Sequence, residues 1–277
     1  MVTSNKRRRT VALYTVATIG ALISIFPYLY MVMQSLAPWN EVDRRVFPTT
    51  FTLRSYQFLL TGGEAGLARP WFRAFFNSFL VTGVDTLCML LVGAMVGYAL
   101  ARLPFRGAKV VRNFLMFQMF YPSIILLIPT FLIIKTLGLN NTYMGMILPK
   151  AVNLWAIFMF SSFFASIDRE LVEAARVDGA SEWTVMSRII MPMSTTIVTV
   201  VGLVLFLERW SELLWDLLVV KDPSHMTLNV LLATMKGPYG NYPGPMYAAS
   251  VLLTLPILIL FIIFSKRFLS GFQFIFR

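Results

Sequence analysis

The chain has 277 residues, of which 57% are apolar and 13% are charged, and its mean hydropathy is +0.71. This composition excludes an ordinary soluble domain and indicates a protein whose solvent is lipid. No soluble basic module carries the net charge of +11, so we expect it to serve membrane topology and contact with anionic lipid headgroups, with no nucleic-acid partner.

Six apolar runs are each long enough to cross a hydrocarbon core of about 30 Å as a helix. The first follows a basic cluster and contains no charge. A signal peptide is the alternative, but its apolar core would span only ~7–15 residues, so we expect an uncleaved anchor. The only cysteine, Cys88, is expected to be a small buried hydrophobe. Pro122, Pro129 and Pro256 are expected to kink their helices, although membrane helices commonly carry proline. The runs are 11–33, 79–101, 114–134, 144–166, 195–220 and 246–264.

Lysine and arginine residues set the expected orientation, because positively charged loops tend to stay in the cytoplasm. If both termini are cytoplasmic, more than half of the 24 basic residues fall on cytoplasmic segments. We therefore predict a multi-pass protein with both termini in the cytoplasm. The basic residues on these segments are Lys6, Arg7, Arg8, Arg9, Arg102, Arg106, Lys109, Arg112, Arg169, Arg176, Arg188, Lys266, Arg267 and Arg277.

The segment between the fourth and fifth runs, residues 167–192, is much longer than a connector between membrane helices needs to be. Asp168 can cap a helix over residues 169–177. Gly179 is well placed to end that helix in a left-handed turn. The spacing therefore predicts a first short helix with a defined start and end.

A second short helix is predicted over residues 182–190, where Ser181 can act as the cap and Pro192 opens the next run. Two short helices that meet at a glycine form a compact elbow, which suits a plug in the groove of a partner. An amphipathic loop lying on the lipid headgroups is the alternative, and physical reasoning alone leaves both open.

The elbow also carries a motif. Residues 173–180 read E-A-A-R-V-D-G-A, and residues 188–192 read R-I-I-M-P. This pattern closely resembles the E-A-A-x3-G signature of bacterial ABC-importer permeases. The chain as a whole is similar to carbohydrate-uptake permeases of the maltose MalG type, and the resemblance covers nearly all of it. Further matching strings are Phe26-Pro27, Gln34-Ser35-Leu36, Phe76-Asn77-Ser78, Gly97-Tyr98-Ala99-Leu100-Ala101-Arg102, Leu137-Gly138-Leu139-Asn140-Asn141-Thr142-Tyr143, Ile147-Leu148-Pro149 and Phe163-Phe164-Ala165-Ser166-Ile167.

The resemblance implies an all-α permease of six transmembrane helices, a single domain over residues 1–277, in the bacterial cytoplasmic membrane. The implied partners are a second homologous permease, two ABC ATPase subunits and an extracytoplasmic solute-binding protein. The chain would form half of a pathway for a carbohydrate or related polar solute. It would be no enzyme, with no catalytic residue or cofactor, and ATP and Mg would bind to the ATPase subunits. The elbow would dock on the ATPase through Glu173, Ala174, Ala175, Asp178, Gly179 and Pro192.

Two stretches depart from the family pattern. Members commonly end in a Gly-rich tail, whereas Ser270-Gly271 is followed here by F-Q-F-I-F-R, which puts a tail contact with the ATPase in doubt. The family string Trp-Asn-acid-x-x-Trp-Pro reads W-S-E-L-L-W-D over residues 210–216. The substrate preference of the family therefore need not transfer.

The fifth run carries acidic residues every four positions, at Glu208, Glu212 and Asp216, so one helix face would hold all three. Charges at membrane depth usually face a cavity or a partner. Carboxylates accept hydrogen bonds from sugar hydroxyls, and the nearby Trp210 and Trp215 offer faces for sugar rings. We predict that these five residues line the solute pathway.

The alternative for this run is structural. Arg209 would pair with an acidic residue across a subunit interface, and Asp216 would reach the outer headgroups. Lone polar residues in other runs, at Asp85, Gln118 and Asn153, are more often satisfied by a neighbouring helix than used for transport.

Residues 221–245 form an external loop that is rich in turn formers. In the resembling importers the equivalent loop meets the solute-binding protein, so Tyr239, Gly240 and Asn241 are candidates for that contact. A rigid turn-rich cap is the alternative. His225 is the only histidine, which argues against a histidine-based metal site within the chain.

A secondary transporter or channel is the main rival class, and a membrane enzyme is a third. The chain has no G-x4-G-K-[ST] phosphate loop, which fits both an ABC permease and a secondary carrier. An ion-coupled carrier has no use for a docking elbow, and six spans without a visible repeat would be few for it. No H-E-x-x-H motif, cysteine cluster or Ser/His/Asp grouping favours an enzyme.

Overall fold

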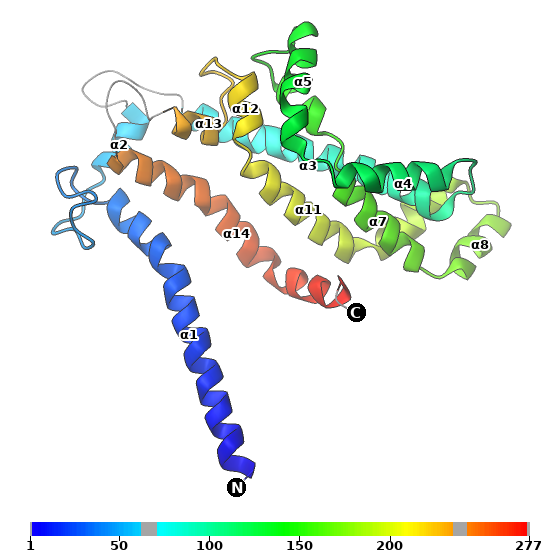
Figure 1. The fold of residues 1–277 in the computed structure, drawn as a ribbon, viewed down its shortest axis with the longest axis horizontal. Helices are drawn as coiled ribbons and strands as arrows, with labels where there is room; N and C mark the ends of the chain where they lie inside the picture. Colours follow the sequence, from blue (N-terminus) through cyan, green and yellow to red (C-terminus); the bar gives the residue numbers. More distant parts are fainter. Residues whose placement is uncertain (1, 62–70, 235–242, 276–277) are drawn as a thin grey trace. The chain divides into compact units, whose positions relative to one another are not determined.

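The computed structural model describes the backbone of residues 2–61, 71–234 and 243–275, and within these ranges all regular elements are helices (Figure 1). This confirms the predicted all-α fold class. The chain forms two compact units, a smaller one of Met1–Trp71 with Leu232–Pro256 and a larger one of Phe72–Leu231 with Ile257–Arg277. A single permease domain over the whole chain stays a prediction.

In the part of the chain that the structure describes, three helices are long and apolar enough to cross a membrane. They are α1 (Val2–Ser35), α3 (Trp71–Arg102) and α14 (Pro243–Ile275), and they contain the first, second and sixth apolar runs. Pro256 lies inside α14 without ending it. An uninterrupted apolar sequence explains these helices, because lipid offers the backbone no hydrogen-bond partner outside the helix itself.

The third apolar run is divided into two helices, α4 (Ala108–Met119) and α5 (Ser123–Thr136), which meet at 102°. Pro122 stands at the start of α5. Proline has no N–H, and its ring clashes with the carbonyl four residues earlier, so α4 cannot continue through it. The kink predicted at Pro122 is therefore a full break, whereas Pro129 lies inside α5.

The fourth run is bent as well, and the fifth run starts at a sharp angle to the helical segment before it. α6 (Tyr143–Ile147) and the 3₁₀ turn η1 (Leu148–Lys150) meet α7 (Leu154–Ser166) at 44°, and the segment Glu182–Met193 meets α11 (Thr195–Trp210) at 81°. The described residues thus contain three candidate spans, or up to six if each bent pair is one span.

The core of the larger unit lies where α3, α7, α11 and the elbow meet, around the fully buried Phe160 and Phe164. α3 approaches α7 closely because Gly93 and Gly97 have no side chains. A Cβ at position 97 would lie 2.7 Å from the Cβ of Phe160 and 2.9 Å from the backbone nitrogen of Ser161. Small residues four positions apart are typical of close helix crossings in membranes.

The smaller unit holds α1, the helix α2 (Arg54–Thr61) and the start of α14. The fully buried Gln34 donates to the carbonyl of Arg45 at 2.7 Å and accepts from the N–H of Asp43 at 2.9 Å. Tyr30 and Tyr247 both donate to a carboxylate oxygen of Asp43, at 3.0 and 2.6 Å. The segment after α1 is therefore a folded cap with its own hydrogen bonds.

Candidate functional site

The elbow of residues 167–192 consists of two helical segments joined at Gly179, as predicted. α8 (Arg169–Val177) begins after Asp168, although the Asp168 side chain makes no capping hydrogen bond. The hydroxyl of Ser181 accepts the N–H of Thr184 at the start of the second segment. That segment comprises α9 (Glu182–Thr184), the π-helical η2 (Val185–Ile190) and α10 (Met191–Met193).

The turn at Gly179 is closed by two backbone hydrogen bonds. Gly179 has a φ of +82°, which confirms the predicted left-handed conformation. Its N–H donates to the carbonyl of Arg176 at 3.0 Å, and the N–H of Ala180 donates to the carbonyl of Ala175 at 3.0 Å. These two bonds form a Schellman motif, which satisfies the carbonyls at the end of α8 and fixes the angle of the elbow.

Polar side chains tie the elbow to α3. Arg176 donates to both carboxylate oxygens of Glu182, at 2.8 and 3.2 Å, and this pairing raises the pKa of the Arg176 guanidinium above its ordinary value. Tyr98 of α3 donates to Glu182 at 2.6 Å. Arg102, at the end of α3, donates to the carbonyl of Phe164 in α7 at 2.9 Å. A displacement of the elbow would therefore directly move α3 and α7, to which these hydrogen bonds connect it.

The elbow presents an exposed face to solvent. Among the predicted docking residues, Ala175 is half-buried and packs against the core of the chain, so Ala174 is the alanine open to a partner. The sequence analysis did not identify Val177 and Trp183, which are 87% and 65% exposed. Both are large apolar residues in an otherwise polar loop, and this feature of the sequence could have identified them as contacts for a partner. The other docking residues, Glu173, Asp178, Gly179 and Pro192, are exposed.

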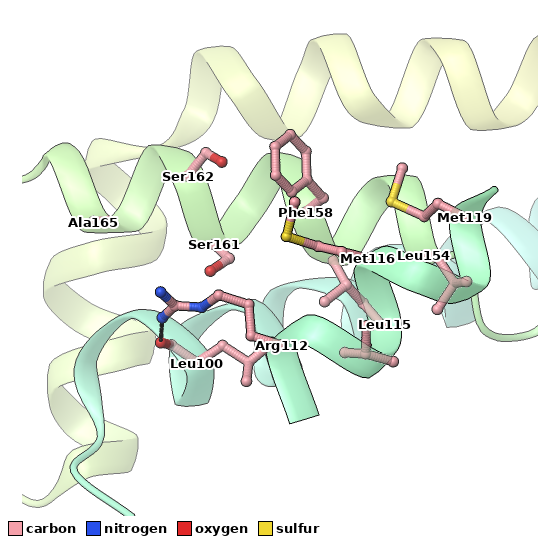
Figure 2. Close-up of a pocket in the computed structure, with 11 residues that line it drawn as sticks. Leu100, Arg112, Leu115, Met116, Met119, Leu154, Phe158, Ser161, Ser162 and Ala165 are labelled. Carbon is pink, nitrogen blue, oxygen red and sulfur yellow. Dashed lines mark hydrogen bonds between the residues drawn. The ribbon is translucent and has the colours of Figure 1, made fainter. Parts of the chain in front are cut away.

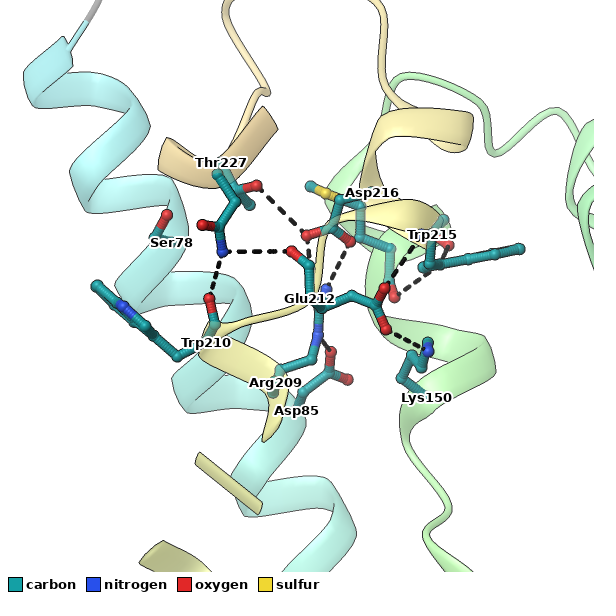
Figure 3. Close-up of polar contacts among 12 residues, drawn as sticks. Ser78, Asp85, Lys150, Arg209, Trp210, Glu212, Trp215, Asp216 and Thr227 are labelled. Atoms are coloured by element: carbon teal, nitrogen blue, oxygen red, sulfur yellow. Dashed lines mark hydrogen bonds and ion pairs between the residues drawn. The ribbon is translucent and has the colours of Figure 1, made fainter. Parts of the chain in front are cut away.

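The second site is a buried ion cluster, which we define as Asp85, Lys150, Arg209, Glu212 and Asp216 (Figure 3). Arg209 donates to both carboxylate oxygens of Asp216, at 3.0 and 2.9 Å, and its Nε donates to Asp85. These three side chains are at most 2% exposed. One oxygen of Asp85 is buried and has no hydrogen-bond partner among the described residues. Arg209 is thus shared by two carboxylates.

The rest of the ion cluster lies at a break in the fifth run. Glu212 pairs with Lys150 at 2.6 Å and accepts the N–H of Trp215 at 3.2 Å, so its carboxylate starts the short helix α12 (Leu214–Val219). Because α11 ends at Trp210, the acidic residues do not share one helix face, and this part of the prediction is wrong. Periodicity predicts a continuous helix, whereas the structure has α11 ending at Trp210 and α12 beginning at Leu214.

The predicted pathway residues differ in exposure. Glu208 is exposed on α11 and Glu212 is half-buried, whereas Asp216 is buried. The buried Trp210 packs against the rings of Phe75, Phe79 and Phe206, and Trp215 donates its indole N–H to the carbonyls of Gly145 and Met146 at 3.2 Å.

One carboxylate oxygen of Asp85 pairs with Arg209 of the neighbouring helix α11, as expected for a lone polar residue, whereas its other oxygen has no partner among the described residues. Asp216, by contrast, does not reach the headgroups as the structural alternative proposed, because it pairs with Arg209. That alternative also placed the acidic partner of Arg209 across a subunit interface, whereas both of its partners lie within this chain. Tyr239, Gly240 and Asn241 lie outside the described residues. Within the described ranges, no group of three or more His, Cys, Asp or Glu side chains could hold a metal ion.

Comparison with known proteins decides the family. A family model described as the inner membrane component of binding-protein-dependent transport systems matches residues 89–269. The chain belongs to this family. The matched residues include the whole elbow and all of the ion cluster except Asp85.

Individual relatives agree with this assignment. The permease is 34% identical over 275 residues to the arabinooligosaccharides transport system permease protein AraQ of Halalkalibacterium halodurans, covering 96% of this chain and 97% of the relative. It is 29% identical over 262 residues to the trehalose/maltose transport system permease protein MalG of Thermococcus litoralis, covering 92% of each.

A solved structure shares the fold of the permease. It is that of a bacterial ABC transporter involved in the import of the acidic polysaccharide alginate, with a TM-score of 0.83 and 20% identity. The match covers 95% of this chain and 97% of that one. At this identity, the likeness establishes the fold alone.

Proposed function

We propose that the permease forms half of the translocation pathway of an ATP-binding-cassette importer for a carbohydrate or related polar solute. The names of its relatives, which refer to arabinooligosaccharides and to trehalose and maltose, support this solute class. In the proposed arrangement the chain crosses the bacterial cytoplasmic membrane six times with both termini in the cytoplasm. The three long apolar helices and three bent pairs support six crossings, and the basic residues support the orientation.

The elbow is proposed to dock on a separate ATPase subunit, and its locked, exposed geometry is the observation that carries this proposal. Val172 is buried at 2% exposure and anchors α8 to the core, while Val177 and Trp183 project outward. Beside α8 lies a groove of about 400 Å³ whose lining includes Arg102, Arg169, Glu173 and Arg176. Arg176 is already paired with Glu182, so Arg102 and Arg169 remain against Glu173, and this excess of positive charge favours an acidic group of the partner.

The remaining partners are a second homologous permease, a second ATPase and an extracytoplasmic solute-binding protein. The family description, which names binding-protein dependence, supports the last of these. The loop of residues 221–245, with Tyr239, Gly240 and Asn241, is proposed to meet the binding protein. ATP and Mg are proposed to bind to the ATPase subunits, where hydrolysis takes place.

The proposed mechanism is alternating access. Closure of the ATPase dimer displaces the elbow, and the contacts of Arg176 and Tyr98 with Glu182 pass that displacement to the end of α3. Arg102 passes it to α7 through the carbonyl of Phe164. The cycle requires that solute and ATP bind with different affinity to the inward-facing and outward-facing states.

A glycine substitution tests the docking proposal. Nothing lies within 4 Å of a Cβ added at Gly179, so the cost of Gly179→Val comes from its positive φ, roughly 1–2 kcal/mol or more for a β-branched residue. The variant should lose co-purifying ATPase or solute-stimulated ATP hydrolysis. Gly179→Asn should retain both, because asparagine tolerates this conformation.

The matched control is Gly138→Val, which places the same residue at a φ of +69° with open space around it, outside the elbow. It should keep ATPase binding. If Gly179→Val keeps wild-type ATPase binding and transport, the elbow is not the coupling element. If both valine variants lose the ATPase equally, general instability explains the loss and the docking assignment fails.

The orientation has its own test. A reporter that is active only in the cytoplasm should be bright when fused after Arg106 or Asp178 and dark when fused after Gly63 or Gly240. A bright signal after Gly240 would overturn the proposed orientation without touching the elbow assignment.

A further inference from the structure

A groove outside the elbow and the ion cluster lies between the end of α3, α4 and α7 (Figure 2). Its volume is about 220 Å³. Pockets for drug-sized solutes measure about 300–1,000 Å³, so the groove is too small for an oligosaccharide. The lining residues are Leu100, Arg112, Leu115, Met116, Met119, Leu154, Ile157, Phe158, Ser161, Ser162 and Ala165.

The groove is polar at one end and apolar at the other (Figure 2). Arg112 lies at the polar end with the hydroxyl of Ser161 turned toward it, and one of its nitrogens donates to the carbonyl of Leu100 at 2.6 Å. Its other N–H groups and the hydroxyl of Ser161 have no protein partner in the described part of the chain. The apolar end is formed by methionine, leucine and phenylalanine side chains of α4 and α7.

The surroundings of the polar end are strongly basic. Arg102, Arg106, Lys109 and Arg112 follow one another at the junction of α3 and α4, and the sequence has no acidic residue between positions 85 and 168. Arg112 is exposed, and α4 has no buried residue. The groove therefore offers anion-binding groups and an apolar channel side by side, open to the medium around the helices.

We propose that this groove binds one anionic phospholipid. The phosphate takes the free N–H groups of Arg112 and the hydroxyl of Ser161, and an acyl chain lies along Met116 and Phe158. A basic site at the cytoplasmic end of membrane helices suits such lipids, because that leaflet carries anionic headgroups. The inference goes beyond the proposed transport function and depends on it only for the choice of leaflet.

Lipid retention tests the proposal. The permease, purified with its bound subunits, is reconstituted with phosphatidylglycerol or phosphatidylcholine, and the lipids that stay bound are measured by native mass spectrometry. Wild type should retain one phosphatidylglycerol in preference to phosphatidylcholine. Arg112→Gln should lower that retention about five-fold, the effect of one basic residue at an anionic surface. Arg106→Gln is the matched control, since it removes a charge from the same junction but not from the groove.

Three outcomes would overturn the proposal. Equal losses in Arg112→Gln and Arg106→Gln would mean that only the general surface charge attracts lipid. Displacement of the retained lipid by glycerol phosphate would mean that the site recognises a free phosphate and makes no use of the acyl channel. A disulfide between Met116→Cys and another protein chain would mean that a subunit covers the groove. Transport activity is not the readout, so failure here leaves the importer assignment intact.

Discussion

The shared guanidinium of Arg209 leads to an ordered set of stability predictions. The perturbations are Arg209→Met, Asp216→Asn and Asp85→Asn. Arg209→Met leaves two carboxylates, each at most 1% exposed, without their cation. Removal of one partner from a buried ion pair costs about 3–5 kcal/mol, so this variant should be the least stable of the three.

The two asparagine variants should differ because the two carboxylates are bound differently. Asp85→Asn leaves the two hydrogen bonds between Arg209 and Asp216 in place. It also leaves one buried carboxylate for one guanidinium, so it should lower the free energy of unfolding by less than about 1 kcal/mol. Asp216→Asn removes one half of that paired interaction, and a hydrogen bond to a charged group contributes about 1.5–3 kcal/mol. It should therefore fall between the other two.

Thermal unfolding of the purified complex in detergent, followed by size-exclusion chromatography, measures this order. Combining Asp85→Asn with Arg209→Met should recover part of the loss, because only one buried carboxylate then lacks a cation. The reasoning is refuted if Arg209→Met is as stable as wild type, or if Asp85→Asn is the most damaging substitution.

Three further predictions concern other parts of the chain. Glu212→Gln should reduce transport while assembly and basal ATP hydrolysis stay near wild type, and failure of the complex to assemble would make Glu212 a structural residue only. Gly97→Ala should destabilise the larger unit by roughly 1–3 kcal/mol in the same unfolding assay, because its Cβ would lie 2.7 Å from a side-chain carbon of α7, whereas Gly83→Ala has open space and should be neutral. Hydrogen bonds from Thr49 lower the pKa of Glu41, so their stabilisation is complete above the unfolded pKa of about 4.3 and is lost as pH falls through the lower folded value. Hydrogen exchange at the Thr49 amide, corrected for its intrinsic rate, should show this loss in wild type and not in Glu41→Gln.

The elbow could be predicted from the sequence because its determinants are local. Gly179 and Ser181 act on neighbours within five residues, and the structure places them as the sequence indicates. The limits of α8 were also correct, although the side-chain cap expected from Asp168 at its start is not made. The π-helical stretch of η2 has no comparable local signal, and it was missed.

The ion cluster could not be predicted because its contacts join distant positions. Arg209 meets Asp85 across 124 residues, and Lys150 meets Glu212 across 62. A four-residue spacing of acids indicates one helix face only if the helix is continuous, and here it ends at Trp210 and starts again at Leu214. The role of Asn77 could not be predicted either, although the residue belongs to one of the family strings. Its side chain donates to the carbonyls of Ser224 and Met226, at 3.0 and 2.9 Å, and only the fold brings these residues together.

The closed turn at Gly179 has a consequence for the kinetics of assembly. Since its backbone hydrogen bonds are made within the chain, the elbow is preorganised, and a partner does not have to order it at about 1–2 kcal/mol per residue. Truncation of the outward side chains of Val177 or Trp183 would then leave the association rate nearly unchanged and shorten the residence time of the complex. Damage to the turn itself would instead reduce the fraction of molecules competent to associate, and would appear as a slower apparent on-rate.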